Sequence, residues 1–285
     1  MDMAKKSSMT ATVDLASAGA TDFALRGLKG LTEQYMPPPL GEFTPEGSWN
    51  QSYAMYVLIP HGARRVGEFT LAREAKDSAG FTLNVQTRRY SVSGFSQFER
   101  AEIQCKNDAL ASPVSWLFDT KLAQEAGDPP YLQSGRRRSG AVRDGMLLIG
   151  DKIRTYRTAL QGAYSNEWTL LEAVQRLPGE RTPPLPYTLI DEYDLLQPSH
   201  RLAYRDQVVV PVKSGSLKLH SYCDLGAGVI PTTYWVDEHH RLVFVCTGLQ
   251  VYALNAANGR TGSCPDRYNS SVGPDPLRNS GDAEK

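Results

Sequence analysis

The chain has 285 residues, in which 31 Lys and Arg balance 31 Asp and Glu, so the formal net charge is zero. A neutral chain lacks the broad basic surface that nucleic-acid binding normally requires, and we therefore expect no nucleic-acid partner. No stretch approaches the ~20 consecutive apolar residues of a membrane-spanning helix, so we also expect no membrane span.

The first 47 residues predict a tail, a short helix and a proline-rich linker. Residues 1–20 are small, polar and aperiodic. Apolar residues then recur at helical spacing and predict a helix from about Asp22 to Gln34, which must end before Pro37-Pro38-Pro39. The opening MDMAKKSSM lacks the apolar core of a signal peptide, and we interpret it as a replaced or truncated leader.

From Trp49 onward, alternating apolar and polar residues between turn residues predict antiparallel strands. The expected strands of this part are Tyr53 to Ile59, Val66 to Arg73, Gly80 to Tyr90, Gln97 to Gln104, Val114 to Asp119, Ser139 to Val142 and Met146 to Tyr156. Asp144-Gly145 is a strong hairpin signal. Gln124 to Gly140 predicts a long polar insertion, in which Arg136-Arg137-Arg138 forms a solvated loop or, alternatively, binds an anion.

One segment in the middle of the chain predicts a second helix. Ser165 or Asn166 can cap the amides that follow, and Trp168, Leu171 and Val174 fall on one face at helical spacing. We expect this helix to run from Asn166 to about Leu177 and to be followed by a proline-rich loop as far as Pro186.

Strands resume in the last third of the chain, and a polar tail over residues 256–285 ends it. The expected strands are Tyr187 to Tyr193, Arg201 to Lys213, Leu217 to Cys223, Val229 to Val236 and Arg241 to Thr247, with Gln197-Pro198-Ser199 as a connection. Lys218, His220 and Tyr222 alternate with apolar residues, which is typical of a strand with one face packed and the other wet or lining a cavity. We assign residues 48–255 to one β domain.

The order of these elements resembles a known family of half-barrels. Tyr53 to Leu71, with a turn before Val66-Gly67, and the ending Tyr234-Trp235-Val236-Asp237 with Arg241-Leu242 resemble the DUF3108-like and lipoprotein-carrier-like proteins. The resemblance implies a mainly β fold, a strongly curved antiparallel meander wrapped around one inserted helix. It also implies an envelope or extracellular protein that holds apolar molecules in its concave face. We therefore expect a periplasmic or extracellular location and a small apolar ligand, with a saccharide as the ligand in the enzymatic alternative.

The sequence carries no motif for a cofactor or metal. We find no GxSxG, HExxH, P-loop or dinucleotide fingerprint, and the four cysteines show no CxxC pair or zinc-ligand spacing. Cys223 and Cys246 lie in predicted strands, where we expect small buried residues, although adjacent strands could bring them within disulfide reach. Asp237-Glu238-His239-His240 predicts a solvated turn rather than a metal site.

Three functions remain open from the sequence. The first is a noncatalytic protein that binds an apolar or amphipathic ligand, with Tyr234, Trp235, Trp168 and Lys218 as binding residues. The second is an extracellular carbohydrate-active lyase or hydrolase, in which His220 is the general base and Tyr222 and Asp191 assist it. The third is a structural envelope protein without a pocket. A dry apolar cavity would favour the first function, a polar cleft the second and a filled core the third.

Overall fold

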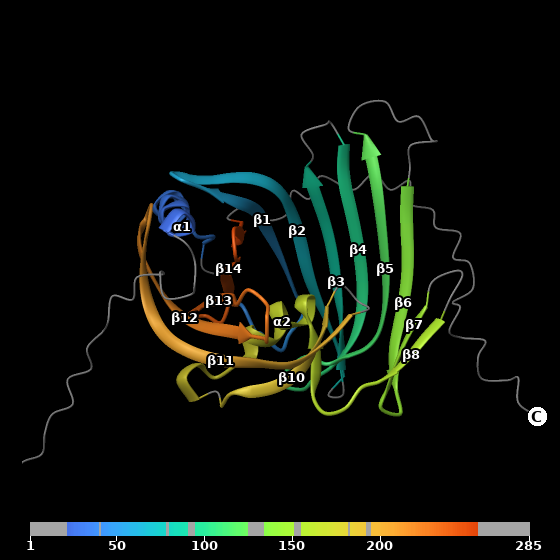
Figure 1. Ribbon diagram of the computed structural model, residues 1–285. Coiled ribbons are helices and arrows are strands. Elements are labelled where there is room, and N and C mark those ends of the chain that lie inside the picture. Colours follow the sequence, from blue (N-terminus) through green and yellow to red (C-terminus); the bar gives the residue numbers. More distant parts are fainter. Residues whose placement is uncertain are drawn as a thin grey trace, which may run out of the picture.

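The computed structural model describes residues 22–39, 41–77, 80–90, 95–124, 134–150, 155–181, 183–191 and 195–255. Strands dominate this part of the chain and form a single large curved sheet, accompanied by two short α-helices (Figure 1). The expected mainly β half-barrel is confirmed. The expected tails, 1–20 and 256–285, lie outside the described residues.

The sheet is built from two runs of strands. The first run comprises β1 (Trp49–Ile59), β2 (Gly62–Asp77), β3 (Gly80–Tyr90), β4 (Phe95–Lys106), β5 (Pro113–Gln124), β6 (Ser134–Arg143), β7 (Met146–Gly150) and β8 (Thr155–Ala159). The second comprises β9 (Tyr164–Asn166), β10 (Leu185–Asp191), β11 (Leu195–Val212), β12 (Gly215–Leu225), β13 (Thr232–Asp237), β14 (Leu242–Thr247) and β15 (Gln250–Leu254). The helices are α1 (Asp22–Gln34) and α2 (Glu167–Ala173), and short 3₁₀ turns follow at Val174–Arg176 and Gly179–Arg181.

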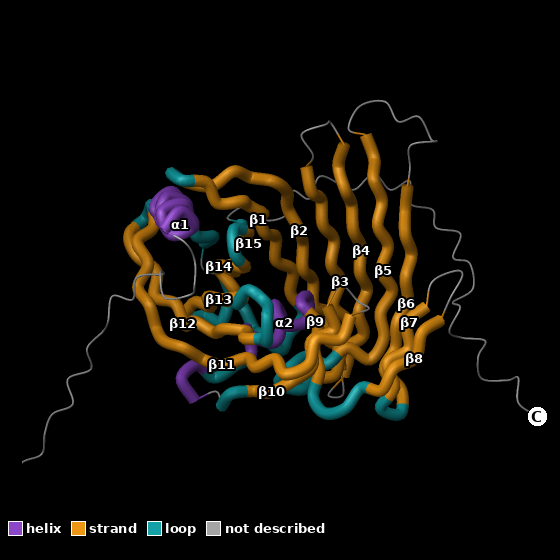
Figure 2. The backbone as a smooth tube through the Cα atoms, viewed as in Figure 1, coloured by secondary structure: helices purple, strands orange, loops and turns teal. Residues whose placement is uncertain are grey.

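The sheet curls because its two edges are joined by a very short connection. Each strand pairs with the next along the chain, β1 pairs with β15, and β8 and β9 form the two edges. Only residues 160–163 separate β8 from β9. Five extended steps of the chain cover at most about 18 Å, so the end of β8 and the start of β9 must lie near each other. The result is the barrel-like curvature visible in Figure 2.

Two serines fix the short edge strand β9 inside the fold. Ser112 Oγ donates to the carbonyl of Tyr164 at 2.9 Å, and Ser165 Oγ donates to the carbonyl of Leu110 at 2.8 Å. Both bonds join β9 to the turn between β4 and β5. On its other side, β9 forms a parallel pair with β10, whereas the other strand pairs in the described residues are antiparallel.

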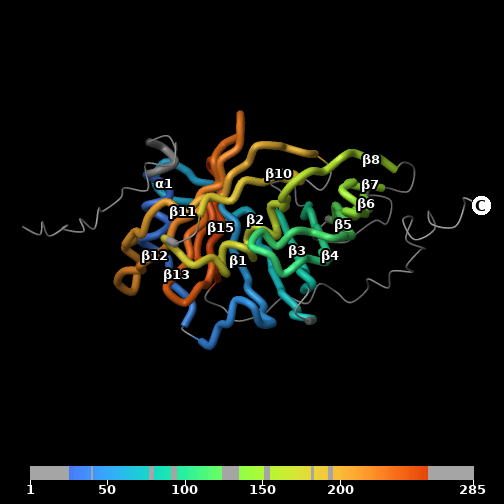
Figure 3. Tube along the Cα trace, turned by 90° about the horizontal axis from the view of Figure 1, so that it is seen from below, coloured from blue at the N-terminus to red at the C-terminus, as the bar shows by residue number. Residues whose placement is uncertain are grey.

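The two helices pack on opposite faces of the sheet. Tyr234 and Val236 of β13 belong to the apolar cluster that contains α2, whereas Trp235 belongs to the cluster that contains Leu28 of α1. Successive side chains of a strand point to opposite faces, so the sheet separates the two clusters. Strands β6–β8 lie at the far end of the molecule from α1 (Figure 3).

Helix α2 is buried on all sides and is capped as the sequence predicts. The side chain of Asn166 accepts the amide hydrogen of Thr169 at 2.8 Å, and the hydroxyl of Thr169 accepts the amide hydrogen of Asn166. The α-helix is shorter than expected, because a 3₁₀ turn replaces it from Val174 onward. Trp168 packs edge-on against Phe69 of β2, with ring centres 5.4 Å apart.

A buried ion cluster ties α2 to β2. The carboxylate of Glu172 accepts from Arg73 Nε and Arg176 Nε, each at 2.8 Å, and the Glu172 side chain is fully buried. Arg73 Nη1 donates to the carbonyls of Glu46 and Gly47, and Arg73 Nη2 donates to Asn107 Oδ1 at 3.2 Å. Burial raises the pKa of Glu172, and the two guanidinium groups oppose that rise.

Helix α1 begins and ends where the sequence predicts and lies unusually close to the β1–β2 turn. A Cβ atom on Gly27 would lie 2.6 Å from the carbonyl oxygen of Ile59 and 2.7 Å from that of Gly62. Only glycine permits this approach of helix to turn. No helix among the described residues is long and apolar enough to cross a membrane.

Two segments expected to be loops are strands. Arg136-Arg137-Arg138 lies in β6, where Arg137 stands opposite Asp119 of β5 and Arg138 is buried. A run of like charges therefore does not indicate a solvated loop when a neighbouring strand supplies a carboxylate, 3.7 Å away for Arg137. The expected connection Gln197-Pro198-Ser199 lies inside β11, where the register with β10 shifts and Ser199 takes a positive φ.

Cys223 and Cys246 are not within disulfide reach, because β13 lies between their strands. Cys223 of β12 stands opposite Thr233 of β13, and Thr233 stands opposite Cys246 of β14. Two strand spacings amount to ~10 Å, which exceeds the Cα separation that a disulfide allows. Cys105, Cys223 and Cys246 are free thiols.

Candidate functional site

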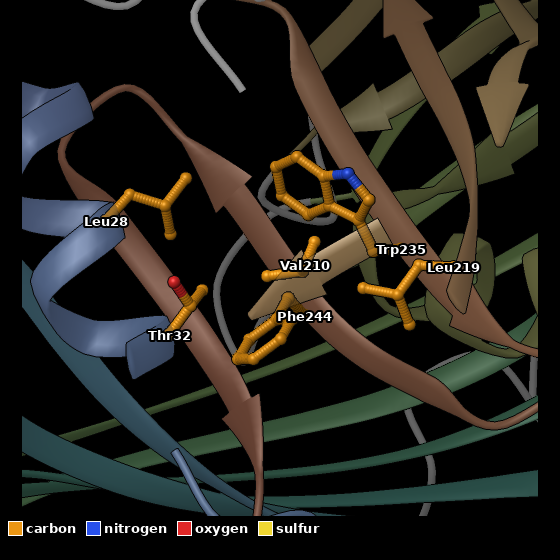
Figure 4. A pocket seen from close by; sticks show the side chains of 6 residues that line it. All are labelled: Leu28, Thr32, Val210, Leu219, Trp235 and Phe244. Atoms are coloured by element: carbon orange, nitrogen blue, oxygen red, sulfur yellow. The ribbon is translucent and has the colours of Figure 1, made fainter. Parts of the chain in front are cut away.

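The hollow of the sheet on the α1 side is filled with side chains. Leu28 and Thr32 of α1 point toward Val210, Trp235 and Phe244 of the strands (Figure 4). The space between these side chains admits no water molecule. The space beneath α1 is therefore filled by contacts of the helix with the sheet rather than by a ligand.

An open groove lies beside the C-terminal half of α1. Its volume is about 290 Å³, and it is bounded by α1 and the two residues after it, by β1 and β2, and by the end of β15 with the residue that follows. Its apolar lining includes Leu31, Met36 and Ala63. Its polar lining includes Gln34, Tyr35, Tyr56 and Asn255.

Tyr35 fixes the wall of this groove. Its hydroxyl donates to the carbonyl of Leu254 at 2.8 Å, its own carbonyl accepts the amide hydrogen of Lys213 at 3.0 Å, and its ring lies 4.6 Å from that of Phe244. Burial raises the pKa of Tyr35, so the phenol keeps its proton. Because its hydroxyl is protonated and hydrogen-bonded, Tyr35 lines the groove and does not act as a nucleophile.

The linker after α1 is also held against the sheet. Arg241 Nε donates to Asp237 Oδ2 at 2.8 Å, and another nitrogen of the same guanidinium donates to the carbonyl of Pro39 at 3.2 Å. Asp237 Oδ1 accepts the backbone amides of His239 and Arg241. Asp237 to His240 thus forms a tight turn, and the described residues contain no group of His, Cys, Asp or Glu that could hold a metal ion.

The structure brings two of the three candidate catalytic residues together. His220 and Tyr222 lie two residues apart on the same face of β12, beside Tyr204 of β11. The hydroxyl of Tyr222 is already engaged, because it donates to the carbonyl of Leu177 at 3.2 Å and accepts the amide hydrogen of Gly179 at 3.0 Å. Burial is the largest cause that lowers the pKa of His220, which leaves its ring neutral near pH 7.

The third candidate, Asp191, lies elsewhere in the sheet. It stands opposite Leu195 near the start of β11, whereas His220 stands opposite Gln207. Twelve residues of strand separate these two points of β11, or ~40 Å along the strand. The carboxylate of Asp191 instead accepts from Gln197 Nε2 at 2.6 Å. Its use beside His220 is therefore unsupported by the geometry, and the catalytic assignment stays a prediction.

Sequence reasoning missed a second histidine with a carboxylate partner. His200 Nδ1 lies 2.9 Å from Asp224 Oδ1, and His200 Nε2 lies 3.2 Å from Gln197 Oε1. The signal in the sequence was a histidine directly after a turn-like Gln-Pro-Ser, which we interpreted as a connection. A Cβ atom on Gly226 would lie 2.4 Å from His200 Nε2, so the next loop covers the ring closely. We interpret this pair as a structural contact between β11 and β12.

The four residues expected to bind a ligand lie in different parts of the structure. Trp168 and Tyr234 are buried in the cluster around α2, and Trp235 is buried against α1. Lys218 is exposed and pairs with Glu238 at 2.8 Å. These residues do not share one pocket wall, and none of them lines the groove beside α1.

Comparison with known proteins assigns no family to this chain. No protein-family model matches the chain, and no curated protein matches it. Among solved structures, it is similar to a beta-barrel-like protein of a domain of unknown function, DUF1849, from Brucella abortus. The identity is 12%, the match covers 73% of this chain and 96% of that one, and the TM-score is 0.49. No comparison connects the chain with the DUF3108-like or lipoprotein-carrier-like groups, so that resemblance stays a hypothesis.

Proposed function

We propose that the protein is a noncatalytic binding protein for a small amphipathic molecule, and that the groove beside α1 is its binding site. The groove itself carries this proposal, since apolar side chains and polar groups line the same open space of about 290 Å³. Ligand pockets commonly combine an apolar wall with a few polar groups that orient the ligand. This volume lies at the small end of known ligand pockets, which favours a short chain or a single ring.

The proposal moves the binding site away from the residues expected from the sequence. Trp168, Tyr234 and Trp235 are buried in the two apolar clusters, and this burial favours a role in stabilising the fold. Gln34, Tyr56 and Asn255 offer polar groups at the groove instead, next to Leu31 and Ala63. A ligand with one polar end fits this lining better than a hydrocarbon does.

The binding site is tested with dodecanoate and dodecyl maltoside as probes in isothermal titration calorimetry. Ala63→Phe fills the groove and should weaken binding at least tenfold, because the phenyl ring takes the space of the ligand. Ala72→Phe is the matched control, since Ala72 lies on the same strand, is also half-buried and does not line the groove. Equal binding by wild type and Ala63→Phe, or no binding of either probe, contradicts the proposal.

The enzymatic alternative is tested in parallel. If the protein cleaves glycans, a polysaccharide screen detects turnover, and His220→Gln should lower it by 10²- to 10⁴-fold as expected for loss of a general base. Glycan cleavage that is lost in this variant would overturn the binding proposal. We expect no turnover, because the hydroxyl of Tyr222 is engaged by backbone groups and Asp191 lies far along the sheet.

Export is a further proposal, and the resemblance of Tyr234 to Asp237 and Arg241-Leu242 to envelope half-barrels supports it. Fractionation of the source cells with an antibody against the folded protein tests it. Recovery in the cytosolic fraction alone contradicts it.

A further inference from the structure

Three turns at one end of the sheet lie next to one another and contain no Asp, Glu, Lys or Arg. They are the β1–β2 turn, the β12–β13 loop and the β14–β15 turn, and we call them the apolar rim (residues 59–62, 226–231 and 248–249). With their flanks, residues 57–63, 225–232 and 247–250 contain no Asp, Glu, Lys or Arg, although 22% of the chain is charged. Surface turns normally attract polar and charged residues, so this composition calls for an explanation.

The three turns touch one another although they are far apart in the sequence. The amide of Leu58 donates to the carbonyl of Leu249 at 2.8 Å, which joins the first turn to the third. A Cβ atom on Gly248 would lie 3.5 Å from Ile230 Cδ1, which joins the third turn to the second. The rim is therefore one continuous surface.

Large aliphatic side chains of the rim face solvent. Ile59 is 42% exposed, Leu249 is 45% exposed and Ile230 is 65% exposed. Each comes from a different turn. Single exposed apolar residues are common, but a contiguous group on neighbouring turns marks a contact surface.

Arginines flank each side of the rim. Arg26 precedes Gly27, which touches the carbonyl of Ile59; Arg64 stands opposite Val57, and Arg201 stands opposite Leu225. All three side chains are exposed. An apolar tip with a basic border matches an anionic bilayer, in which acyl chains meet the aliphatic residues and the lipid phosphates meet the arginines. A second copy of the chain fits less well, because a symmetric contact would bring the same arginines together.

We propose that the apolar rim docks the protein reversibly on an anionic lipid surface, with Ile59, Ile230 and Leu249 entering the headgroup region. The groove proposed to bind an amphiphile begins at the same place, since a Cβ atom on Gly30 would lie 3.1 Å from the Cα atom of Gly62. The composition and exposure of the rim and its flanking arginines support the docking surface, which does not require the groove to bind.

Vesicle flotation tests this proposal with the full chain. Wild-type protein should float with vesicles of phosphatidylcholine containing about one third phosphatidylglycerol, and much less with phosphatidylcholine alone. Ile230→Asp and Leu249→Asp should each lower the partition coefficient at least tenfold, because a carboxylate must then enter the interface. Arg64→Gln should lower it about fivefold on anionic vesicles only.

Val209→Asp is the matched control. Val209 is 46% exposed, nearly the same as Leu249, but it stands opposite Lys218, which lies eight residues before Gly226, the first rim residue after β12. This variant should float like wild type, and all variants should keep the wild-type melting temperature because the changed side chains are exposed. Absence of wild-type flotation, or flotation of Ile230→Asp equal to wild type, overturns the proposal. So does a wild-type dimer in sedimentation that Ile230→Asp dissociates without any vesicle binding, because the rim is then an interface between copies.

Discussion

Replacing Trp168 with alanine should cause one of the largest losses of stability available in this fold. Trp168 is 6% exposed and lies in the cluster that joins α2 to the sheet. Its ring meets Phe69 edge-on, and Phe69 in turn stacks on Tyr53 with ring centres 4.6 Å apart. Large aromatic truncations in cores cost ~3 to 5 kcal/mol, and the lost ring contact belongs to that total.

The same change should be visible in both chemical and thermal unfolding. A loss of this size is a large part of the ~5 to 15 kcal/mol that stabilises an ordinary domain, so the urea midpoint should fall sharply. The melting temperature should fall by roughly 10 °C, using ~2 to 4 °C per kcal/mol for a protein of this size class. Far-ultraviolet circular dichroism and tryptophan fluorescence should report the same midpoint if unfolding is two-state.

Trp49→Ala is the control for this experiment. Trp49 is half-buried, lies 5.9 Å from the ring of Phe43, and its indole donates to the carbonyl of Pro45 at 3.0 Å. Its removal should cost less than half as much, because water already reaches part of the ring. A loss below about 1 kcal/mol for Trp168→Ala, or a loss equal to that of Trp49→Ala, would refute the packing of α2 against the sheet.

Three further predictions concern buried groups. The pKa of Glu172 is raised above 4.5 in the folded state, so the unfolded chain loses this proton first as pH rises. The stability of wild type relative to Glu172→Gln should therefore be highest below about pH 4.5 and should fall as pH passes through the raised pKa. Urea melts that show this relative stability rising with pH would contradict the prediction. Burial raises the pKa of Cys246 from 9.0 to about 11, so Cys246 should alkylate roughly 100-fold more slowly at pH 7 than a thiol of ordinary pKa. Burial also raises the pKa of Cys105, so this thiol should alkylate slowly too. Peptide mass mapping checks both, and rapid labelling of either would disprove the reasoning. A Cβ atom on Gly140 would lie 2.1 Å from the indole of Trp116, so Gly140→Ala should lower the free energy of unfolding by ~1 to 3 kcal/mol. An unchanged urea midpoint would show that the indole can move aside freely.

Local signals in the sequence were sufficient for the elements that are bounded by strong breakers. Helix α1 ends before three prolines, and β3 begins at a glycine, and both were predicted with the observed bounds. The strand at Ser139 to Val142 was predicted, but the first half of β6 was missed, because a run of three arginines indicates a loop when it is considered alone. Its strand conformation depends on β5, in which Asp119 stands opposite Arg137. That information is not local.

The candidate sites depended even more on contacts between distant segments. The groove is formed by residues 30–36, 56–63 and 253–255, and the apolar rim by three turns from both ends of the sheet domain. Nothing within any one of these segments indicates that the others lie beside it. By contrast, the shared face of His220 and Tyr222 was accessible from strand periodicity, since they lie two residues apart.

The pairing of β1 with β15 makes the fold depend on its most distant segments. The first run of strands and the second run are each continuous in sequence, and Tyr53 opposite Leu254 lies in the strand pair that joins them. During synthesis, β1 must therefore wait for nearly the whole domain to be made before its second neighbour exists. Such non-local pairing slows folding and leaves a long strand edge open in the meantime. Helix α1, which packs beside that edge on β1 and β2, is already made by then and can cover part of the apolar surface of β1 until β15 arrives.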